Sequence, residues 1–583
     1  LCAIALKTNL CYLKVMEKLE ICTILKDIAT LLELTGENLF KVRAYENAIH
    51  SLENTDKTIK ELIETHELEE LKGIGEAITK KITELATTDH LKYYDELKAS
   101  IPPGLIEMLK LQGMGPKKIN HLYTELNITT LDELEKACLE NKILELKGFG
   151  QITQDHILKS IDFIKSHKNQ YRISTAMESA KDIIKYLKQA HDDIIRLELG
   201  GSLRRFRETV KDIDLLASSR NPDKTMELFI SYPHTASIIG HGHTKTSITL
   251  DNGINVDLRV VSDKEFPYAW HHFTGSKAHN IHMRALAKEK NIKMNEYGLW
   301  KNDKIIPCKD EKNIFKAIGL NYIPPEARED MGEIEFAMKN KFPKLIEKKD
   351  IKGAIHVHTT WSDGKNNLEE MALAARDLGY SYIGIAEHSA SAIYANGLSI
   401  DRVKEQKKEI DKLNKKIKGI YILQGIEVEI LNDGSIDYPP NILESFDFTI
   451  AAVHNNFNMD IKEMTSRLIS ALKNKYVNIL AHPTGRLLLE REAYPVDMNE
   501  VIQAASDYGK IIELNCNPKR LDIDWRHLKQ AKEKNVLISI DTDAHNIESL
   551  GFIEYGIGIA RKGWLCKEDV ANTRSVDKFL KNS

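Results

Sequence analysis

Apolar residues recur every three to four positions from residue 16 to about residue 165, with few β-branched runs. This spacing predicts a region that is nearly all α-helix. From residue 171 to about 325 the pattern becomes mixed. The stretches IRLELGG, DIDLLASS and GINVDLRVV read as strands, and AWHHFTGSKAHNIHMRALAKEKN returns to helical spacing. The pattern therefore predicts a helical N-terminal region followed by an α/β region.

From about residue 350 onward, short apolar strands alternate with helices. The predicted strands lie in GAIHVHTT, YIGIAEHS, YILQGIEVEI, FTIAAVHN, VNILAHPT, IIELNCN and LISIDTDAH. Such alternation predicts a parallel sheet or barrel. Six of these seven strands carry a His, Asp or Glu at or near the C-terminal end. Barrel active sites are built at that end, so we expect a catalytic site there.

The length of 583 residues suggests about four domains. A net charge of −4 gives no general attraction for nucleic acid, so any DNA binding has to be local. The seven scattered cysteines include no CxxC pair, which favours a reducing cytoplasm over a disulfide scaffold. We find no apolar run of membrane-spanning length. We read no signal peptide near the start, and residues 1–15 are a candidate spurious extension ahead of Met16.

A glycine-containing phrase occurs three times between predicted helices, as LKGIG (71–75), LQGMG (111–115) and LKGFG (146–150). The paired glycines allow a tight turn and leave N–H groups free at the next helix, where they can bind an anion. One copy alone would fit an ordinary glycine at a helix end. Three copies favour the helix-hairpin-helix motif, which contacts DNA phosphates without reading sequence. The candidate DNA-binding residues are Gly73, Gly75, Gly113, Gly115, Gly148 and Gly150.

Three aspartates form the first candidate chemical site. Asp212 and Asp214 are two positions apart in a predicted strand, so their carboxylates face the same way, and Asp257 on another strand can join them. Convergent carboxylates suit two Mg²⁺ ions, which can activate a hydroxyl and stabilise a leaving oxygen. A lone Asp-x-Asp would more often be a solvated strand end. The upstream Gly-Gly-Ser turn and the third aspartate favour the metal site.

These motifs, GGSLRR…DIDLL, VDLRV and HHFTGSKAHNIHMR, resemble the nucleotidyltransferase core of the X-family DNA polymerases, the family of DNA polymerase beta. The resemblance covers about residues 16–325. It implies that Asp212, Asp214 and Asp257 hold Mg²⁺. His272 stands where the eukaryotic enzymes have Tyr, which leaves the strength of deoxyribose selection open. The residues that match nucleotide-binding positions are Gly201, Ser202, Arg205, Phe273, Gly275, Asn280 and Arg284.

The helical N-terminal part resembles the small lyase domain of the same family. Lys81, in GEAITKKI, matches the position of its Schiff-base lysine. A buried or cation-flanked lysine has a lowered pKa and can act as a nucleophile. Lys81 can equally bind a phosphate beside the first hairpin, and both interpretations stay open.

A second candidate site begins at IHVHTTWSDG. His356 and His358 alternate with Ile355 and Val357, so both imidazoles point to one side of a predicted strand. Mixed imidazole and carboxylate ligands suit Zn²⁺, Mn²⁺ or Fe²⁺ better than Mg²⁺ alone. The ligand candidates are too many for one ion; they are His356, His358, Asp363, His388, Glu427, His454, His482, Asp543 and His545.

The motif order HVHTTWSDG…AEHS…GIEVEI…AAVH…AHPTGR…DTDAH resembles the polymerase and histidinol phosphatase (PHP) domain over about residues 346–583. The resemblance implies a distorted (β/α)7 barrel with three metal ions. One ion would be held by His356, His358, Glu427 and Asp543, a second by Glu427, His454 and His482, and a third by Asp363, His388 and His545. Glu387, beside His388, either supports a ligand or is neutral.

The expected fold is multidomain. We expect a helical lyase-like domain (16–100), a fingers-like helix-hairpin-helix domain (101–170), an α/β palm (171–260), a thumb-like part (261–325), a linker (326–345) and the PHP barrel (346–583).

The two resemblances together imply a DNA polymerase that fills short gaps in repair. It would carry its own 3′-5′ exonuclease with 3′-end processing or abasic-site endonuclease activity. We expect Mg²⁺ at the polymerase site and Mn²⁺ or Zn²⁺, up to three ions, in the PHP site. We also expect gapped or nicked DNA and dNTPs as partners, no membrane, a monomer, and a cytoplasmic, nucleoid-associated location. The alternatives are a repair nuclease or 3′-phosphatase whose polymerase half only holds DNA, a non-catalytic DNA-end scaffold, and a ribonucleotide-adding transferase.

Overall fold

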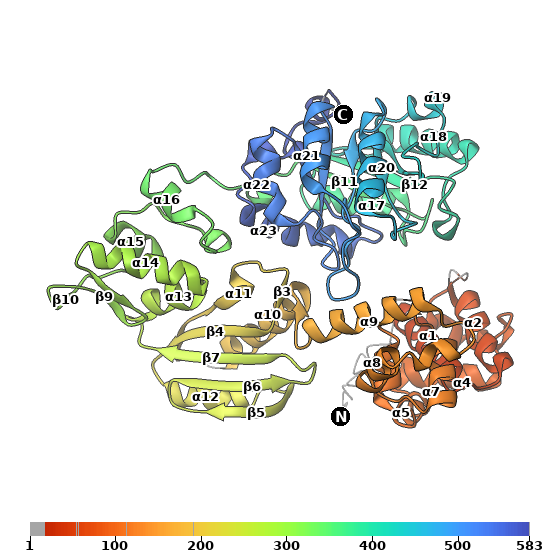
Figure 1. Ribbon diagram of the computed structural model, residues 1–583, viewed down its shortest axis with the longest axis horizontal. Coiled ribbons are helices and arrows are strands. Elements are labelled where there is room, and N and C mark those ends of the chain that lie inside the picture. Colours follow the sequence, from red (N-terminus) through yellow and green to blue (C-terminus); the bar gives the residue numbers. More distant parts are fainter. Residues whose placement is uncertain (1–17, 54, 56, 112, 191, 582–583) are drawn as a thin grey trace, which may run out of the picture. The chain divides into compact units, whose positions relative to one another are not determined.

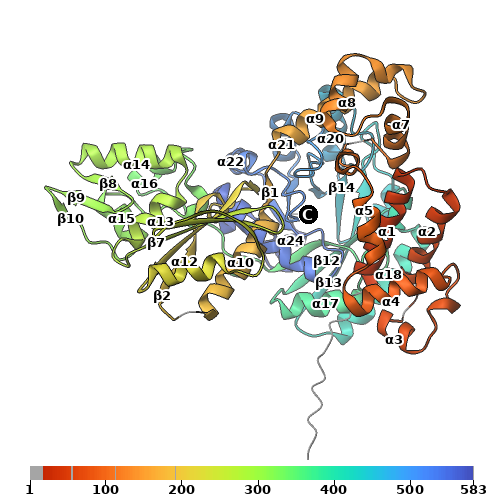
Figure 2. The same cartoon turned by 90° about the horizontal axis from the view of Figure 1, so that it is seen from below.

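The computed structural model describes residues 18–53, 55, 57–111, 113–190 and 192–581, and divides into two compact units after Lys168 (Figures 1 and 2). The predicted extension at residues 1–15 lies outside the described residues. The first unit is built from helices, as the apolar spacing predicts. They are α1 (Lys18–Leu34), α2 (Leu39–Glu53), α3 (Ile59–Glu64), α4 (Glu76–Thr88), α5 (Lys92–Ala99), α6 (Pro103–Met108), α7 (Pro116–Leu126), α8 (Leu131–Leu139) and α9 (Gln151–Ser166).

The first unit has two hydrophobic cores that share helix α1. Leu25 of α1 is buried with Tyr45 and Ile82 of α2 and α4. Leu31, nearer the C-terminal end of α1, belongs to a second core with Ile119 and other residues of α6 to α9. Because α1 contributes to both cores, it holds the two halves of the unit together.

The second unit begins with a five-stranded sheet of order β2-β4-β7-β6-β5. Strands β4 and β7 are parallel, and the other neighbours are antiparallel. The elements are β1 (Tyr171–Arg172), α10 (Ile173–Ala190), β2 (Ile194–Leu199), α11 (Gly201–Arg204), β3 (Thr209–Val210), β4 (Asp212–Ser219), α12 (Pro222–Ile230), β5 (Thr235–His241), β6 (Lys245–Leu250) and β7 (Asn255–Val261). The apolar pattern does not reveal β5, because all its residues after Thr235 are exposed.

The helical stretch that follows forms two helices with a small sheet beside them. Its elements are α13 (Phe266–Thr274), α14 (Lys277–Glu289), β8 (Lys293–Asn295), β9 (Gly298–Lys301), β10 (Lys304–Ile305), α15 (Glu311–Ala317) and α16 (Glu333–Met338). Residues 326–345 were expected to be a linker. They instead carry α16 and bury Ile334, Ala337 and Leu345 in the core around Met283 and Phe315. The segment is therefore part of this core.

The C-terminal part is a parallel barrel whose seven strands follow one another in chain order, which confirms the predicted fold. The strands are β11 (Gly353–Val357), β12 (Tyr382–His388), β13 (Tyr421–Glu429), β14 (Phe448–Ala452), β15 (Ile479–Leu480), β16 (Ile511–Asn515) and β17 (Ile538–Asp541). Val357 also forms a parallel bridge to Ala544, which brings the first strand back to the chain after the last.

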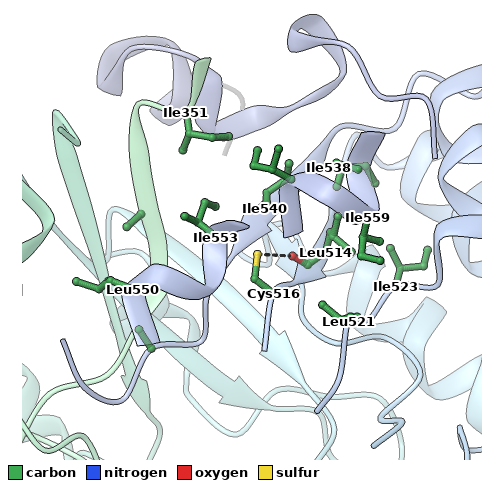
Figure 3. Packing of buried hydrophobic residues seen from close by; sticks show 14 of the residues in the cluster. Ile351, Leu514, Cys516, Leu521, Ile523, Ile538, Ile540, Leu550, Ile553 and Ile559 are labelled. Atoms are coloured by element: carbon green, nitrogen blue, oxygen red, sulfur yellow. Dashed lines mark hydrogen bonds between the residues drawn. The ribbon is translucent and has the colours of Figure 1, made fainter. Parts of the chain in front are cut away.

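Phe448 fills the interior of the barrel. A Cβ atom on Gly384 or Gly425 would lie 2.7 or 2.2 Å from its ring, so neighbouring strands need glycine there. On the outer face of the barrel, Leu514 of β16 and Ile540 of β17 pack with Ile553 and Ile559 of α23 (Ile553–Lys562), as Figure 3 shows. The remaining helices of this part are α17 (Leu368–Asp377), α18 (Ile400–Lys416), α19 (Pro440–Leu443), α20 (Ile461–Lys473), α21 (Met498–Asp507), α22 (Trp525–Glu533) and α24 (Val576–Leu580).

Sheet and barrel contact each other within the second unit. A Cβ atom on Gly558 of α23 would lie 1.9 Å from the ring of Phe206, so the two chain segments pack closely. Arg172 donates to the backbone oxygen of Leu488 at 3.1 Å, and Arg561 donates to Glu326 at 2.7 Å. The two candidate catalytic regions therefore lie on one packed body.

Candidate active sites

The three palm aspartates converge on the β4–β7 strand pair. Asp214 and Asp257 are register partners, and Asp212 lies two residues earlier on the same face of β4. Burial, then the nearby charges of Asp212 and Asp257, raise the pKa of Asp214 to about 6. Burial and Asp257 also raise the pKa of Asp212. Repulsion among carboxylates favours either a proton or a cation, so this oxygen-donor set fits hard divalent ions.

Strand β6 contributes two side chains that the sequence did not point to. Ser247 donates to Asp257 Oδ1 at 2.6 Å, and Lys245 Nζ lies 2.6 Å from Asp257 Oδ2. They orient one carboxylate and offset part of the local negative charge. The turn before β4 also comes close, because a Cβ on Gly201 would lie 2.0 Å from Asp214 Oδ2. Gly201 has φ +58°, a region that glycine tolerates best.

The predicted phosphate ligand Arg205 is engaged by other protein groups. Its Nε donates to Glu329 at 3.0 Å, and its Nη1 donates to the Thr274 backbone oxygen at 2.7 Å. Glu329 also accepts from Lys562 of α23 at 2.5 Å. Lys562 is only 1% exposed, and its Nζ also donates to the Arg205 backbone oxygen at 3.1 Å. A buried network thus links the candidate nucleotide site to the barrel.

The FTGS turn between α13 and α14 gathers most other nucleotide-binding candidates. Asn280 donates to the backbone oxygens of His272 at 2.7 Å and Gly275 at 3.4 Å, so its amide supports this turn. A Cβ on Gly275 would lie 2.5 Å from Asn280 Oδ1. The Arg259 guanidinium stacks 4.5 Å from the Phe273 ring centroid. Two further candidates are placed less deeply: Ser202 on α11 is partly buried, and Arg284 on α14 is exposed.

The three hairpins share one backbone geometry. Gly73, Gly113 and Gly148 all have positive φ angles, +91°, +77° and +93°. Gly75, Gly115 and Gly150 are the N-caps of α4, α7 and α9, each without a side-chain cap. A Cβ added at any of these six except Gly73 would meet nothing within 4 Å. The free amides at the helix starts are therefore open to a phosphate oxygen.

Lys81 lies on α4, one helical turn into the first hairpin's second helix. Its ammonium is 4.5 Å from the Tyr93 ring centroid and donates to the Ala77 backbone oxygen at 3.3 Å. Burial, and then the charge of Lys41, lower the pKa of Lys81. This environment suits a nucleophilic lysine, and the neighbouring lysine also suits a phosphate.

Nine predicted ligands converge at the C-terminal ends of the barrel strands. Three overlapping groups have ligand atoms within 4.8 Å of one another: His358, Asp363, His388 and His545; His356, His358 and Asp543; His388, Glu427 and His454. His482 Nε2 lies 3.2 Å from Glu427 Oε1 and completes the set. His358 and His388 thus each belong to two of these groups. The resemblance to the PHP domain had assigned each of them to a single metal ion.

The nitrogen and oxygen atoms of the cluster have few protein partners. His356 Nε2, His358 Nε2 and Glu427 Oε2 are buried and accept or donate no hydrogen bond. Glu427 Oε2 nevertheless lies 3.0 Å from His388 Nδ1 and 3.4 Å from His356 Nε2. Buried polar atoms without partners are costly, and metal ions bound between them would satisfy them. The unpartnered nitrogen and oxygen atoms therefore fit a site that binds metal ions.

Carboxylates behind the cluster orient its histidines. Glu513 accepts from His356 Nδ1 at 2.5 Å, and from the His482 backbone N–H at 2.7 Å. Glu429 accepts from His454 Nδ1 at 2.9 Å. The sequence analysis missed both supporting roles, although a glutamate inside a buried apolar strand was a usable signal. Such partners fix which ring nitrogen faces the metal.

Glu387, whose role the sequence left open, does not belong to any of the candidate metal groups. It accepts from the Thr359 hydroxyl at 2.5 Å and the Thr359 backbone N–H at 3.1 Å. Burial raises its pKa to about 7. Its contacts hold the turn that follows His358, so it supports the ligand loop.

Comparisons with known protein families match separate stretches of the chain. Residues 16–91 match the helix-hairpin-helix domain family, and residues 105–161 match the SAM-like helix-hairpin-helix tandem. Residues 269–329 match the DNA polymerase beta thumb, and residues 354–517 match the PHP domain. Within the described residues, no helix has both the length and the apolar character needed to cross a membrane.

Three relatives match different extents of the chain. Repair DNA polymerase X of African swine fever virus is 33% identical over 171 residues, which is 27% of this chain and 93% of the viral protein. A probable phosphatase of Thermoanaerobacter sp. (strain X514) is 33% identical over 181 residues, 29% of this chain and 71% of that protein. DNA polymerase/3′-5′ exonuclease PolX of Bacillus subtilis (strain 168) is 39% identical over 575 residues, covering 97% of this chain and all of the relative. The chain therefore belongs to the PolX family, the X-family DNA polymerases with a C-terminal PHP domain.

Proposed function

We propose that this chain is a DNA-directed DNA polymerase that fills short gaps during repair, and that its barrel is a 3′-5′ exonuclease that trims the same DNA ends. The observation that carries the proposal is the presence of two separate ligand sets, three palm aspartates and nine barrel residues, in one chain. The full-length similarity to a protein named DNA polymerase/3′-5′ exonuclease supports it.

In the palm, Asp212, Asp214 and Asp257 would hold two Mg²⁺ ions. Bound Mg²⁺ would stabilise the attacking and leaving oxygens during phosphoryl transfer. Ser247 and Lys245 keep the Asp257 carboxylate in place, and Gly201 lets the turn approach Asp214. Arg205 would exchange Glu329 for the triphosphate of the incoming nucleotide. The FTGS turn, supported by Asn280, would lie under the deoxyribose.

In the barrel, the nine residues would hold up to three Mn²⁺ or Zn²⁺ ions, since imidazole–carboxylate sets favour these metals. Such ions polarise a phosphodiester and lower the pKa of bound water. Glu513 and Glu429 keep His356 and His454 in the tautomer that presents Nε2 to the metal. The open hairpin amides would position gapped or nicked DNA through its phosphates, with the chain acting as a monomer. We also propose the cytoplasm, in association with the nucleoid, as its location.

Lys81 carries a second candidate activity, the removal of a 5′-deoxyribose phosphate through a Schiff base. Its partial burial over Tyr93, and the lowered pKa, favour this activity.

A single assay tests the main proposal: the purified full chain on a one-nucleotide-gapped duplex, with dNTPs, with rNTPs or without nucleotides, in Mg²⁺ or Mn²⁺. We expect gap filling with dNTPs and shortening of the 3′ end without them. Shortening without any extension would support the nuclease whose polymerase half only holds DNA. Binding without either reaction would support the scaffold. Extension with rNTPs as fast as with dNTPs would support the ribonucleotide-adding transferase.

A further inference from the structure

Two large apolar side chains stand exposed beside the barrel's ligand cluster. They are Ile393 and Tyr394, in the short helical turn Ile393–Ala395 that follows strand β12. Ile393 is 86% exposed, more than any other large apolar side chain in the described residues, and Tyr394 is 71% exposed. Exposed apolar side chains grouped at a site, rather than scattered, mark a surface that binds something.

Tyr394 lies against two of the metal-ligand candidates. Its ring centroid is 6.0 Å from that of His388 and 6.3 Å from that of His454. This is the accessible side of the cluster: the side chains of Asp363 and His454 are 33% and 16% exposed, whereas that of His356 is fully buried. Tyr394 therefore lies at the accessible edge of the cluster, beside His388 and His454.

The loop that carries the pair is held firmly by its neighbours. Asp437 accepts hydrogen bonds from the hydroxyls of Ser389 and Ser391, both at 2.6 Å. Arg402 donates to the Asn396 backbone oxygen at 2.8 Å. A Cβ on Gly397 would lie 1.9 Å from the Ser389 backbone oxygen, so the chain folds tightly back on itself. Ile393 and Tyr394 are thus presented at a fixed place.

The buried position of the ligands limits which DNA can react. A phosphodiester at the end of a duplex has to leave the stacked helix before it can reach the cluster, and its terminal base is then unpaired. An unpaired base stacks on an aromatic ring whatever its identity, with a gain of about 1–3 kcal/mol per base. An exposed tyrosine at the entrance, with an isoleucine beside it, offers such a surface without reading sequence.

We propose that Tyr394, flanked by Ile393, is the nucleobase subsite of the barrel's hydrolytic site, and that it binds the terminal base of an unpaired 3′ end. The inference rests on the proposed 3′-5′ exonuclease function and adds the side chain that holds the terminal base. Single-stranded and frayed 3′ ends bind better than paired ends, because the subsite offsets part of the cost of unpairing.

The test compares two single-stranded oligonucleotides that differ only in whether the last nucleotide carries a base. Cleavage of both by the full chain is measured in Mn²⁺; in the base-free end, a tetrahydrofuran ring takes the place of the terminal deoxyribose and its base. With Tyr394→Ala, we expect KM for the normal end to rise about 5- to 150-fold. KM for the base-free end is expected to stay unchanged. Tyr394→Trp keeps a stacking surface and should restore the normal KM.

Two measurements separate this effect from damage to the site. The amount of bound Mn²⁺ and the maximal cleavage rate of the base-free end, which offers no aromatic ring at its terminus, should be the same in Tyr394→Ala and wild type. Tyr508→Ala is the matched control, because Tyr508 is 44% exposed and precedes strand β16, at the strand end away from the ligands.

The outcomes separate the subsite from the proposed function. A wild-type chain that cleaves neither oligonucleotide would reject the exonuclease itself. Active wild type with an unchanged KM in Tyr394→Ala would overturn the subsite alone. An equal rise in KM for both ends would indicate a contact with the DNA backbone or with another protein surface, and would also overturn the base assignment.

Discussion

Replacing Glu513 by glutamine should weaken metal binding in the barrel while leaving nucleotide addition intact. Glu513 is fully buried and accepts from three donors: His356 Nδ1 at 2.5 Å on one oxygen, and the His482 backbone N–H at 2.7 Å and Asn515 Nδ2 at 3.2 Å on the other. Glutamine has the same shape but only one acceptor oxygen. Whichever way its amide turns, an NH₂ group faces one of these N–H donors.

The size of the effect follows from these contacts. Hydrogen bonds to a charged group contribute about 1.5–3 kcal/mol, and loss of a partner behind a metal ligand weakens metal binding about 10- to 100-fold. We therefore expect the Mn²⁺ concentration at half-maximal exonuclease rate to rise about 10- to 100-fold. The maximal rate should recover at saturating Mn²⁺, because the ligands themselves remain.

The assay is a Mn²⁺ titration of 3′-end shortening, with gap filling measured in parallel. Glu492→Gln is the charge-matched control, because Glu492 is exposed and lies outside the ligand groups. A thermal melt of each variant checks folding. An unchanged Mn²⁺ midpoint in a folded Glu513→Gln protein would refute the supporting role. A loss that excess Mn²⁺ cannot reverse would refute the argument that only ligand orientation has changed.

Three further predictions concern the other sites. Replacing Gly113 and Gly115 together by valine should lower affinity for gapped DNA equally for all sequences. Valine is strained at the φ of +77° that Gly113 adopts, and the added side chains block the approach of a phosphate to the open amides. Unchanged affinity in a folded variant would make this hairpin purely structural. Borohydride should trap the chain on DNA with a 5′-deoxyribose phosphate, and Lys81→Ala should abolish the adduct; full trapping in the variant would reject Lys81 as the nucleophile. Nucleotide addition should fall as pH drops through about 6, since the raised pKa of Asp214 leaves its carboxyl protonated and unable to hold metal below that value; more Mg²⁺ should shift the profile to lower pH, and a profile that ignores Mg²⁺ would contradict this cause.

Most of the barrel's candidate ligands could be picked out from the sequence because they lie in or just after a predicted strand. His356 and His358 do meet at Glu427, but not through regular alternation, because β11 ends at Val357, its register shifts between Ala354 and Val357, and His356 has φ +58°. The division of the nine residues among three ions was less accessible. His388 lies 3.0 Å from Glu427 and 3.7 Å from Asp363, and only three-dimensional packing gives such distances.

Partners from distant segments could not be predicted from local patterns. Arg205 was read as a phosphate ligand, but its binding to Glu329, and through it to Lys562, joins residues far apart in the chain. Strand β5 was missed because it is an exposed edge strand with no buried face to produce alternation. Glu513 stands out as a glutamate within an apolar strand, but its partner His356 lies far away in the chain and could not be read from the local pattern.

The central claim is that one chain holds two independent metal sites with different reactions. The most direct measurement compares Asp212→Ala with the double variant His356→Ala/His358→Ala on one gapped duplex whose 3′ nucleotide is correctly paired, so that gap filling does not depend on prior hydrolysis. Gap filling, 3′-end hydrolysis and bound Mn²⁺ or Zn²⁺ are measured for each folded protein. The account predicts that Asp212→Ala loses nucleotide addition only, and that the histidine variant loses bound metal and 3′-end hydrolysis only. Equal loss of both reactions in either folded variant would contradict it.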